Sequence, residues 1–245
     1  MTQPVNPPGG IHTVLLDAGG VLLDLDFAYL RRLLESRDHP VESSDLARAE
    51  GLARLEIDRR VRDGGRASEA WRDYFRVLLS AVHSPLDSRE EIIDVLRDAH
   101  ERFGLWTVPA PGAIPAMREL KRRGYRLGVV SNAEGRVERD LNAAGYDGLF
   151  ETIVDSSIVG FEKPDPAIFR IALERLGVVA QGTVFLGDVP AVDVAGARAA
   201  GIAAVLLDRF DLYPAADAPC LRSIGDLPPW LESQSRDDLV QNVTA

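Results

Sequence analysis

Short apolar runs that end at polar residues constrain the fold of this chain more than any other feature. Four such runs occur, at residues 11–16, 125–130, 183–186 and 202–207. Runs of this length are typical of strands buried on both faces of a parallel sheet. Stretches with helical periodicity lie between the runs and end at glycines, namely Gly124, Gly145, Gly177 and Gly201. Because strands alternate with helices, we predict an α/β fold with a Rossmann-like three-layer core around a mostly parallel sheet.

Residues 24–106 have a different pattern. They contain no convincing strand, and amphipathic helices are predicted at residues 27–37, 44–63, 68–82 and 88–103. We therefore predict an α/β core of residues 1–23 and 107–245, with an all-α cap of residues 24–106 inserted after the first strand. An insertion at this point overhangs the carboxyl ends of the strands, where open parallel sheets bind ligands.

The composition limits the partners and the location that we expect. The net charge is -10, so the surface repels nucleic acid, and any phosphate site must supply its own local positive charge. No apolar run approaches the roughly 18 residues that would span a membrane, and the N-terminus lacks the features of a signal peptide. We expect a cytoplasmic protein with no membrane partner, either a monomer or a homodimer. The lone Cys220 excludes an intramolecular disulfide and is interpreted as a buried free thiol.

Polar residues follow three of the apolar runs. They are Asp17, Ser131 and Asp188, and Lys163 lies in the segment GFEKP between the last two. Adjacent parallel strands would bring these side chains together at the carboxyl edge of the sheet. Two carboxylates with open positions suit a hard cation such as Mg²⁺, which shares its remaining ligands with water and phosphate. Asp193 could hold a metal-bound water, and an ordinary aspartate near a helix start is the alternative interpretation.

Four motifs occur in order along the chain. They read VLLDAGGVLLD, LGVVSN, GFEKPDPAIF and LGDVPAVDVAGARAAG. In these motifs the chain resembles the haloacid dehalogenase superfamily, and the third motif resembles the subgroup that carries a helical cap. The resemblance covers residues 11–207, and the helical block falls where that subgroup inserts its cap. It implies a phosphatase that acts on a small phosphorylated molecule.

The resemblance also implies a nucleophile and a metal site. Asp17 matches the nucleophile, which attacks phosphorus and forms an aspartyl-phosphate that water then hydrolyses. A carboxylate is ionised well below neutral pH, so it needs no base to activate it. The Mg²⁺ ligands implied by the family pattern are Asp17, the backbone carbonyl of Gly19, Asp188 and, through water, Asp193. The cation screens the repulsion between two anions that must approach each other.

The second and third motifs are expected to bind the phosphoryl group. Ser131 and Asn132 lie at the end of a predicted strand, and Lys163 supplies positive charge to the phosphoryl oxygens and to Asp17. A loose phosphoryl-transfer transition state spreads its charge over those oxygens, so preset positive groups stabilise it.

Gly19 departs from the family pattern. The phosphatases of the family carry an aspartate two residues after the nucleophile, where it serves as general acid and then as general base. General acid–base catalysis contributes about 10²–10⁴-fold, so its loss should slow the enzyme without abolishing activity. The loss should be smallest for leaving groups that need little protonation, such as an anomeric hydroxyl or a phenol.

The segment after Gly19 favours sugar phosphates as substrates. Asp24-Leu25-Asp26-Phe27 is similar to a segment of certain bacterial sugar-1-phosphate phosphatases that also have glycine at this position. We therefore hypothesise a sugar phosphate as the substrate. Asp24 or Asp26 could donate a proton through water, although a polar carboxylate without a catalytic role is the favoured interpretation.

Three other functions stay open. A 2-haloacid dehalogenase would use Asp17 on carbon without a metal, but that branch lacks the Gly-Asp pair found here at Gly187 and Asp188. A phosphonate-cleaving relative would need a lysine in the cap, and residues 24–106 contain none. The third is a catalytically silent protein that binds a phosphorylated ligand or a partner, and Gly19 motivates it.

Aromatic and histidine side chains receive structural interpretations. Trp71, Tyr74 and Phe75 share one helical stretch, and we predict that they form cap core rather than pocket wall. No metal-ligand spacing links the histidines, which are predicted to have surface or packing roles. They are His12, His39, His83 and His100.

Overall fold

A parallel sheet forms the centre of the larger half of the molecule. The computed structural model describes residues 10–84 and 88–234, and its six-stranded sheet has the order β5-β4-β1-β6-β7-β8. Every pair of neighbouring strands in this sheet is parallel. The strands are β1 (Thr13–Leu16), β4 (Arg126–Ser131), β5 (Thr152–Asp155), β6 (Thr183–Gly187), β7 (Ala203–Leu207) and β8 (Cys220–Leu221). The predicted α/β fold is confirmed, and the short strands β5 and β8 extend the predicted sheet.

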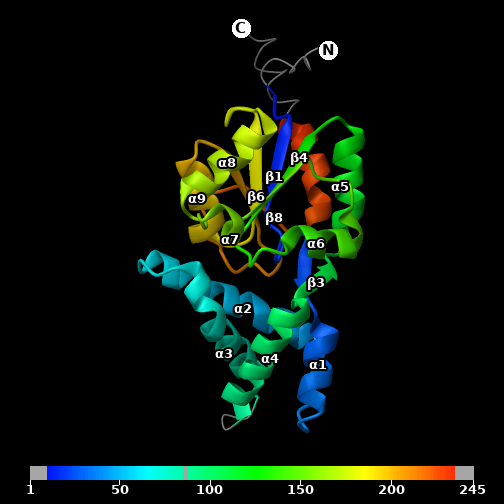
Figure 1. Ribbon diagram of the computed structural model, residues 1–245, viewed down its shortest axis with the longest axis vertical. Helices are drawn as coiled ribbons and strands as arrows, with labels where there is room; N and C mark the ends of the chain where they lie inside the picture. Colours follow the sequence, from blue (N-terminus) through cyan, green and yellow to red (C-terminus); the bar gives the residue numbers. More distant parts are fainter. Residues whose placement is uncertain (1–9, 85–87, 235–245) are drawn as a thin grey trace.

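Helices cover both faces of this sheet, with α8 and α9 on one side of the strands in Figure 1 and α5 on the other. The helices are α5 (Ala113–Arg122), α6 (Val137–Leu141), α7 (Ser156–Val159), α8 (Pro166–Leu176) and α9 (Ala195–Ala199). Single turns of other helix types lie at η3 (Asn142–Tyr146), η4 (Pro190–Val194) and η5 (Ile224–Asp226). The four glycines predicted to close helices all have positive φ, as a left-handed closing residue requires.

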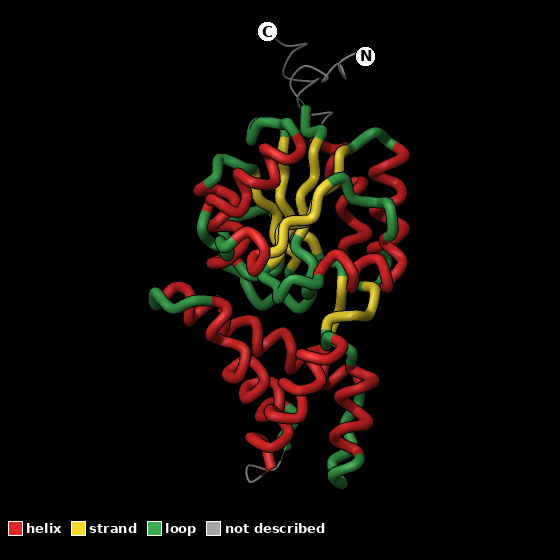
Figure 2. The backbone as a smooth tube through the Cα atoms, in the orientation of Figure 1, coloured by secondary structure: helices red, strands yellow, loops and turns green. Residues whose placement is uncertain are grey.

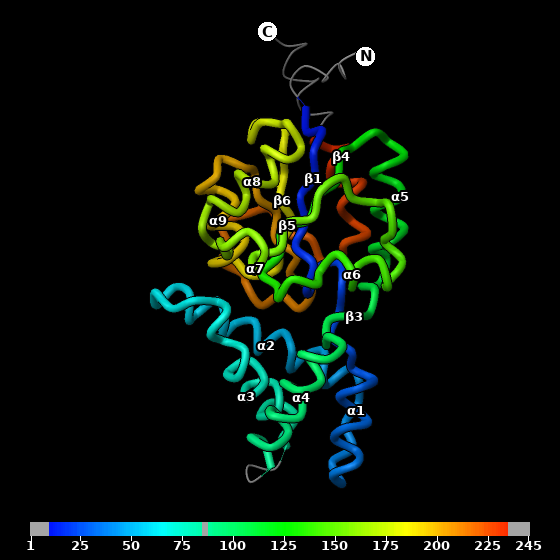
Figure 3. The backbone as a smooth tube through the Cα atoms, in the orientation of Figure 1, coloured from blue at the N-terminus to red at the C-terminus, as the bar shows by residue number. Residues whose placement is uncertain are grey.

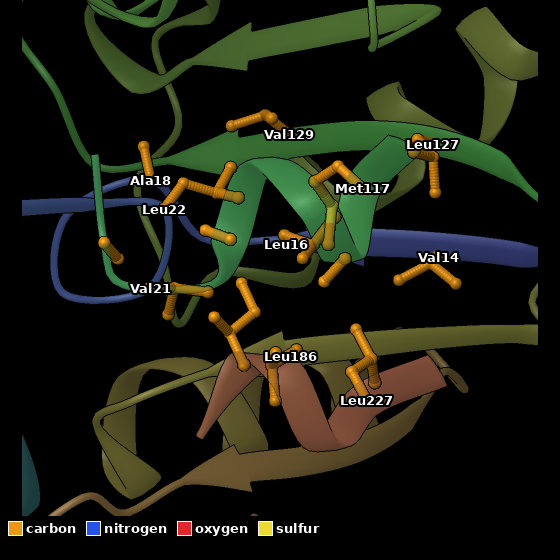
Figure 4. Close-up of a cluster of buried hydrophobic side chains, with 14 of the residues drawn as sticks. Val14, Leu16, Ala18, Val21, Leu22, Met117, Leu127, Val129, Leu186 and Leu227 are labelled. Carbon is orange, nitrogen blue, oxygen red and sulfur yellow. The ribbon is translucent and has the colours of Figure 1, made fainter. Parts of the chain in front are cut away.

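Two apolar layers hold the helices to the sheet. Successive side chains of a strand point to opposite faces, so Val14 and Leu16 of β1 lie in one buried cluster with Met117 of α5 (Figure 4). Leu15 lies in the other cluster, with Phe169 of α8. These two clusters account for the three-layer core.

The smaller half consists of helices and lies below the sheet in the view of Figure 2. Its helices are α1 (Phe27–Glu35), α2 (Ser43–Arg62), α3 (Trp71–Ala81) and α4 (Arg89–Phe103), and the short turn η1 (Ala67–Ala70) precedes α3. We call α1–α4 together with η1 the cap. Its buried side chains, among them Leu30, Phe75 and Leu96, form an apolar cluster of their own.

A two-stranded antiparallel ribbon joins the cap to the sheet. It consists of β2 (Leu23–Leu25) and β3 (Trp106–Pro109). Figure 3 shows the chain leaving the sheet after β1 and returning through β3. The prediction that residues 24–106 contain no strand is therefore wrong at both ends of that segment. Strands of three and four residues are too short to show a regular alternation in the sequence.

Expectations drawn from composition have mixed outcomes. Cys220 is exposed, so the prediction of a buried thiol is wrong. Its neighbour Leu221 is buried, and because side chains alternate along a strand, Cys220 points away from the core. Within residues 10–84 and 88–234, no helix is long and apolar enough to cross a membrane. The signal-peptide expectation rests on residues 1–9, which lie outside the described residues.

Candidate active site

Three neighbouring strands carry the predicted polar residues to one edge of the sheet. β1 lies between β4 and β6, with Leu16 paired to Val129 on one side and to Leu186 on the other. Asp17 follows β1, Ser131 ends β4, and Asp188 follows β6. The parallel register therefore places these side chains together at the carboxyl edge, where the sequence analysis predicted a site.

Lys163 lies at the centre of this group. Its Nζ atom is 2.8 Å from Oδ1 of Asp17 and 2.7 Å from Oδ1 of Asp193, and its side chain is 1% exposed. Burial lowers the pKa of Lys163, but the two carboxylates outweigh it, so the net shift is upward and the ammonium stays charged. A buried charge without such partners would cost several kcal/mol (on the order of 3–5). Asp17, Lys163 and Asp193 therefore depend on one another for stability.

Asp193 also organises the loop that carries Asp188. Its Oδ2 atom accepts hydrogen bonds from the backbone N–H groups of Asp188 and Val189, at 3.0 and 2.9 Å. Gly187 permits this approach, because a Cβ atom there would lie 2.3 Å from Cβ of Asp193. The side chain of Asp193 thus fixes the position of Asp188 relative to the lysine.

Asn132 clamps the backbone of Lys163. The side-chain oxygen of Asn132 accepts from the lysine N–H at 2.7 Å, and its amide nitrogen donates to the lysine carbonyl at 3.0 Å. This pair of hydrogen bonds holds the segment after β4 against the segment that carries the lysine. Asn132 also borders the cavity described below, and its predicted contact with substrate stays a prediction.

The cap supplies a second buried cation that the sequence analysis missed. Arg54 of α2 is 6% exposed, and its Nη1 atom lies 3.0 Å from Oδ2 of Asp188. Its Nη2 atom lies 2.7 Å from Oε1 of Glu50, which also accepts a hydrogen bond from the hydroxyl of Tyr74 at 3.1 Å. In the sequence, Glu50 and Arg54 are indistinguishable from the ordinary surface pairs that helices form four residues apart.

The charges at the edge of the sheet do not balance. Among the residues that line the cavity described below, the buried carboxylates are Asp17, Asp188, Asp193 and Glu50, and the buried cations are Lys163 and Arg54. Burial raises the pKa of Asp188 to about 7, with Arg54 opposing this shift and the other carboxylates adding to it. Burial likewise raises the pKa of Asp17 in spite of the nearby lysine. The buried carboxylates of the site therefore outnumber its buried cations.

A divalent cation would correct this imbalance. Oxygen atoms of Asp17, Asp188 and Asp193 lie within 4.8 Å of one another. Carboxylate oxygens in a small group, with room for water or phosphate, are the ligands that Mg²⁺ takes in proteins. The residues present thus fit the metal that the sequence motifs imply.

No side chain at position 19 can exchange a proton with a ligand. The nearest atom to a Cβ built on Gly19 is Cδ1 of Trp106, at 3.5 Å, so an indole borders the place where an acid would project. Asp24 pairs with Arg209 at 2.7 Å, and Asp26 caps α1 by accepting from the Tyr29 N–H. Neither aspartate borders the cavity, which supports the interpretation that they have no catalytic role.

A cavity of about 270 Å³ lies between the cap and the edge of the sheet. The core contributes Asp17, Ser131, Lys163 and Asp188 to its wall, and the cap contributes Arg54, Trp71, Tyr74, Arg97 and His100. Gly20 lies at its floor with a φ of +77°, and a Cβ atom there would lie 2.1 Å from Oδ2 of Asp188. Glycine is required at this position because of both its conformation and the close carboxylate.

The aromatic and histidine predictions hold only in part. Phe75 and Tyr74 are buried in the cap cluster as predicted, although Tyr74 also borders the cavity. Trp71 packs against the cluster and likewise borders the cavity. His100 packs against the rings of Trp71 and Trp106 and also borders the cavity, where its Nε2 lies 3.0 Å from Oε1 of Glu134. Amphipathic spacing cannot separate these roles, because a cap core and a cavity wall are both apolar surfaces on a helix.

The family pattern described as haloacid dehalogenase-like hydrolase matches residues 11–201, which is most of the chain. The chain belongs to the haloacid dehalogenase-like hydrolases. The matched range includes all of the site residues described above and the whole cap.

This hydrolase is similar to several curated phosphatases. It is 27% identical to Phosphatase MT3486 of Mycobacterium tuberculosis over 81% of this chain and 88% of that protein. It is 34% identical to a phosphoserine phosphatase of Thermus thermophilus over 55% of this chain and 53% of that protein. It is 36% identical to a phosphoglycolate phosphatase of Rhodospirillum rubrum over 49% of this chain and 52% of that protein. In the last two cases the match spans about half of each relative's length.

Solved structures of the same family share the fold of this hydrolase. The HAD-hydrolase YfnB of Bacillus subtilis, bound to magnesium, matches with a TM-score of 0.66 at 22% identity and covers 91% of this chain and 99% of its own. A HAD phosphatase of Thermococcus onnurineus matches with a TM-score of 0.54 at 24% identity. The match covers 89% of this chain and 97% of that one. These likenesses support the overall fold.

Proposed function

We propose that this hydrolase is a magnesium-dependent phosphatase that removes phosphate from a small phosphorylated metabolite through an aspartyl-phosphate on Asp17. The observation that carries the proposal is the buried contact of Lys163 with Asp17 and Asp193 beside Asp188, at the floor of a cavity. The curated relatives named above as phosphatases support the same reaction class.

The residues of the site have distinct parts in this reaction. Asp17 is the nucleophile, and its Oδ1 is held by Lys163 and by the N–H of Ala18 at 2.7 Å, which orients the carboxylate. It forms a bond to phosphorus as the bond from phosphorus to the leaving oxygen breaks, and water then cleaves the acyl phosphate. Ser131 and Lys163 hold the phosphoryl oxygens.

Asp17, Asp188, the carbonyl of Gly19 and, through water, Asp193 would hold Mg²⁺. When bound, the cation supplies positive charge between the nucleophile and the phosphoryl oxygens. The excess of carboxylates over cations at this site is the feature of the chain that supports it.

Gly19 restricts the leaving groups that such an enzyme handles well. With glycine at this position and indole carbon beside it, the leaving oxygen departs without a proton from the usual aspartate. Sugar phosphates with an anomeric phosphate are the substrates that we favour, because an anomeric oxygen is a comparatively good leaving group. The same glycine favours the second candidate, a protein that binds a phosphorylated ligand without turning it over.

Hydrolysis of p-nitrophenyl phosphate with and without Mg²⁺ separates these two functions. We expect Mg²⁺-dependent release of nitrophenol that Asp17→Asn abolishes, with unchanged circular dichroism. Acid quenching during turnover should trap phosphate on the protein in a hydroxylamine-sensitive form. An absence of turnover with every metal, together with saturable binding of phosphate esters, would instead establish the binding protein.

A further inference from the structure

One arginine of the cap faces the cavity without a carboxylate partner. Arg97 of α4 borders the same cavity as Asp17 and Lys163, and its guanidinium carbon lies 4.0 Å from the centre of the Trp71 ring. In the described parts of the chain, no Asp or Glu lies within ion-pair distance of Arg97. Its positive charge therefore stays available to the cavity.

Each carboxylate on the cavity wall has a cation other than Arg97 as its ion-pair partner. Glu50 and Asp188 share Arg54, and Asp17 and Asp193 share Lys163. Two further pairs complete the set, Glu162 with Arg66 at 2.6 Å and Glu134 with His100 at 3.0 Å. Arg97 acts on Glu134 at longer range, as one of several cations that together outweigh burial and lower the pKa of that carboxyl.

The position of Arg97 over the Trp71 ring restricts the geometry of its guanidinium group. A guanidinium that lies over an aromatic ring keeps its plane fixed and leaves its N–H groups pointing outward along their edges. Those edges match the two oxygens of a carboxylate or a phosphate, which bind arginine in a bidentate manner. Holding a long side chain in place in advance also reduces the entropy lost when a ligand binds.

We propose that Arg97 binds a second anionic group on the substrate, so that the preferred substrates are phosphate monoesters whose leaving group carries a carboxylate or a second phosphate. This inference rests on the proposed phosphatase function and narrows its substrate class. It agrees with a sugar phosphate as substrate when the sugar is an acid or a bisphosphate. The phosphoryl group lies at Lys163 in the core, and the second anion lies against α4 of the cap.

Matched pairs of substrates test this proposal. Glycerol 3-phosphate and 3-phosphoglycerate differ by a carboxylate, as do glucose 6-phosphate and 6-phosphogluconate; fructose 6-phosphate and fructose 1,6-bisphosphate differ by a phosphate. We expect the wild-type protein to prefer the more anionic member of a pair by about tenfold or more in kcat/KM. Arg97→Gln should remove most of that preference, mainly through KM, since hydrogen bonds to charged groups have this strength. Preference in the first two pairs identifies a carboxylate, and preference in the third identifies a phosphate.

Two controls make the outcome decisive. Arg102→Gln removes an exposed arginine of the same helix that does not border the cavity, and it should keep the wild-type preference. Arg97→Lys should recover only part of it, because lysine keeps the charge and loses the bidentate geometry. Equal preference in wild type and Arg97→Gln would overturn the role of Arg97 while p-nitrophenyl phosphate turnover still supports the phosphatase.

Calorimetry covers the case in which turnover is absent. Binding of 3-phosphoglycerate and glycerol 3-phosphate to Asp17→Asn, with and without Arg97→Gln, measures the same preference without hydrolysis. A tenfold weaker binding of 3-phosphoglycerate in the double variant, with little change for glycerol 3-phosphate, supports the inference. An equal loss for both ligands contradicts it.

Discussion

At the scale of single residues, the choice of lysine at position 163 is informative. The chain has 28 basic residues and only two of them are lysine, so arginine is its default cation. A compact ammonium can contact two carboxylates at 2.7–2.8 Å within a site that leaves 1% of its side chain exposed. A planar guanidinium carries its charge on a larger, rigid fork. The site therefore has a lysine, although nearly all other basic residues of the chain are arginine.

The raised pKa of Asp188 predicts a pH-dependent response to Mg²⁺. Its folded-state pKa of about 7 exceeds the ordinary value of 3.8. The proton on this carboxyl therefore stabilises the metal-free fold. That contribution to stability is lost as the pH rises through about 7. Mg²⁺ requires the ionised carboxylate. The increase in Tm on adding Mg²⁺ should therefore be larger at pH 8 than at pH 6, as scanning calorimetry would measure.

Asp188→Asn is the matching control for this experiment. It should flatten the pH dependence of the Mg²⁺ effect, because the titrating group is removed. A Tm increase that is equal at pH 6 and pH 8 in the wild type would contradict the prediction that Asp188 must lose a proton when Mg²⁺ binds.

Gly19→Asp should restore part of the missing proton transfer. A Cβ atom at this position meets Trp106 at an ordinary contact distance of 3.5 Å, so a side chain can begin here without a clash at Cβ. Since general acid–base catalysis contributes about 10²–10⁴-fold when well placed, we expect a gain of roughly tenfold on alkyl phosphates. Turnover of p-nitrophenyl phosphate should change little, because nitrophenolate leaves without a proton.

Gly19→Asn has nearly the same shape and no acid, so steady-state rates of the two variants isolate the proton. Equal rates for both on an alkyl phosphate would show that the position no longer reaches the leaving oxygen.

At the scale of elements, α2 contacts the sheet half at several points. Gly51 lets the helix approach the loop after β7, where an added Cβ would lie 2.8 Å from Cδ1 of Leu212 and 3.1 Å from Cδ2 of Phe210. Next to it, Oδ1 of Asp58 accepts a hydrogen bond from the N–H of Ala191 at 2.7 Å. One helix face thus carries Arg54 to Asp188.

Gly51→Leu should hold the cap away from the sheet. The larger side chain cannot share the space of Leu212, and overpacking of this kind costs about 1–3 kcal/mol. We expect kcat/KM to fall about tenfold while circular dichroism stays unchanged. Arg48→Leu, on an exposed position of the same helix, is the control and should keep wild-type kinetics. Normal kinetics in Gly51→Leu would mean that the helix tolerates a wider separation during turnover.

At this scale the sequence predicts the strand-end residues well and the cap contacts poorly. Asp17, Ser131 and Asp188 could be placed because a parallel sheet collects the ends of its strands at one edge. Arg54 and Trp106 could not, because their positions depend on how helices and the ribbon pack in three dimensions. Periodicity shows which face of a helix is apolar and does not show what that face contacts.

At the scale of the whole molecule, the cap and the sheet half have separate apolar interiors. The cap cluster includes Leu30, Phe75 and Leu96, whereas the sheet residues lie in two other clusters, and Trp106 packs against both the cap cluster and one of these. The α/β class and the helical block were predictable, since each has its own periodicity. The ribbon between them was not, since its strands have three and four residues. The predicted domain boundaries, which assign residues 24–106 to the cap and the rest to the core, stay a prediction.

Because the cap and the sheet half have separate apolar interiors, we predict that they unfold separately. Cooperative units of a protein open independently when few buried contacts join them. We expect amide protons of α1–α4 to exchange at a lower urea concentration than those of β1, β4 and β6 in native-state hydrogen exchange. Mg²⁺ should protect the strands more than α1, which is not part of the cavity wall. A single exchange transition for both halves would contradict this expectation.

The narrow ribbon has a consequence for how such a protein changes over generations. Because two short strands carry the chain across, side chains of α4 on the cavity wall can be exchanged while the packing of the sheet around Asp17 stays the same. Changes in the helical cap can then alter which ligands the cavity accepts, while the residues at the edge of the sheet are inherited unchanged.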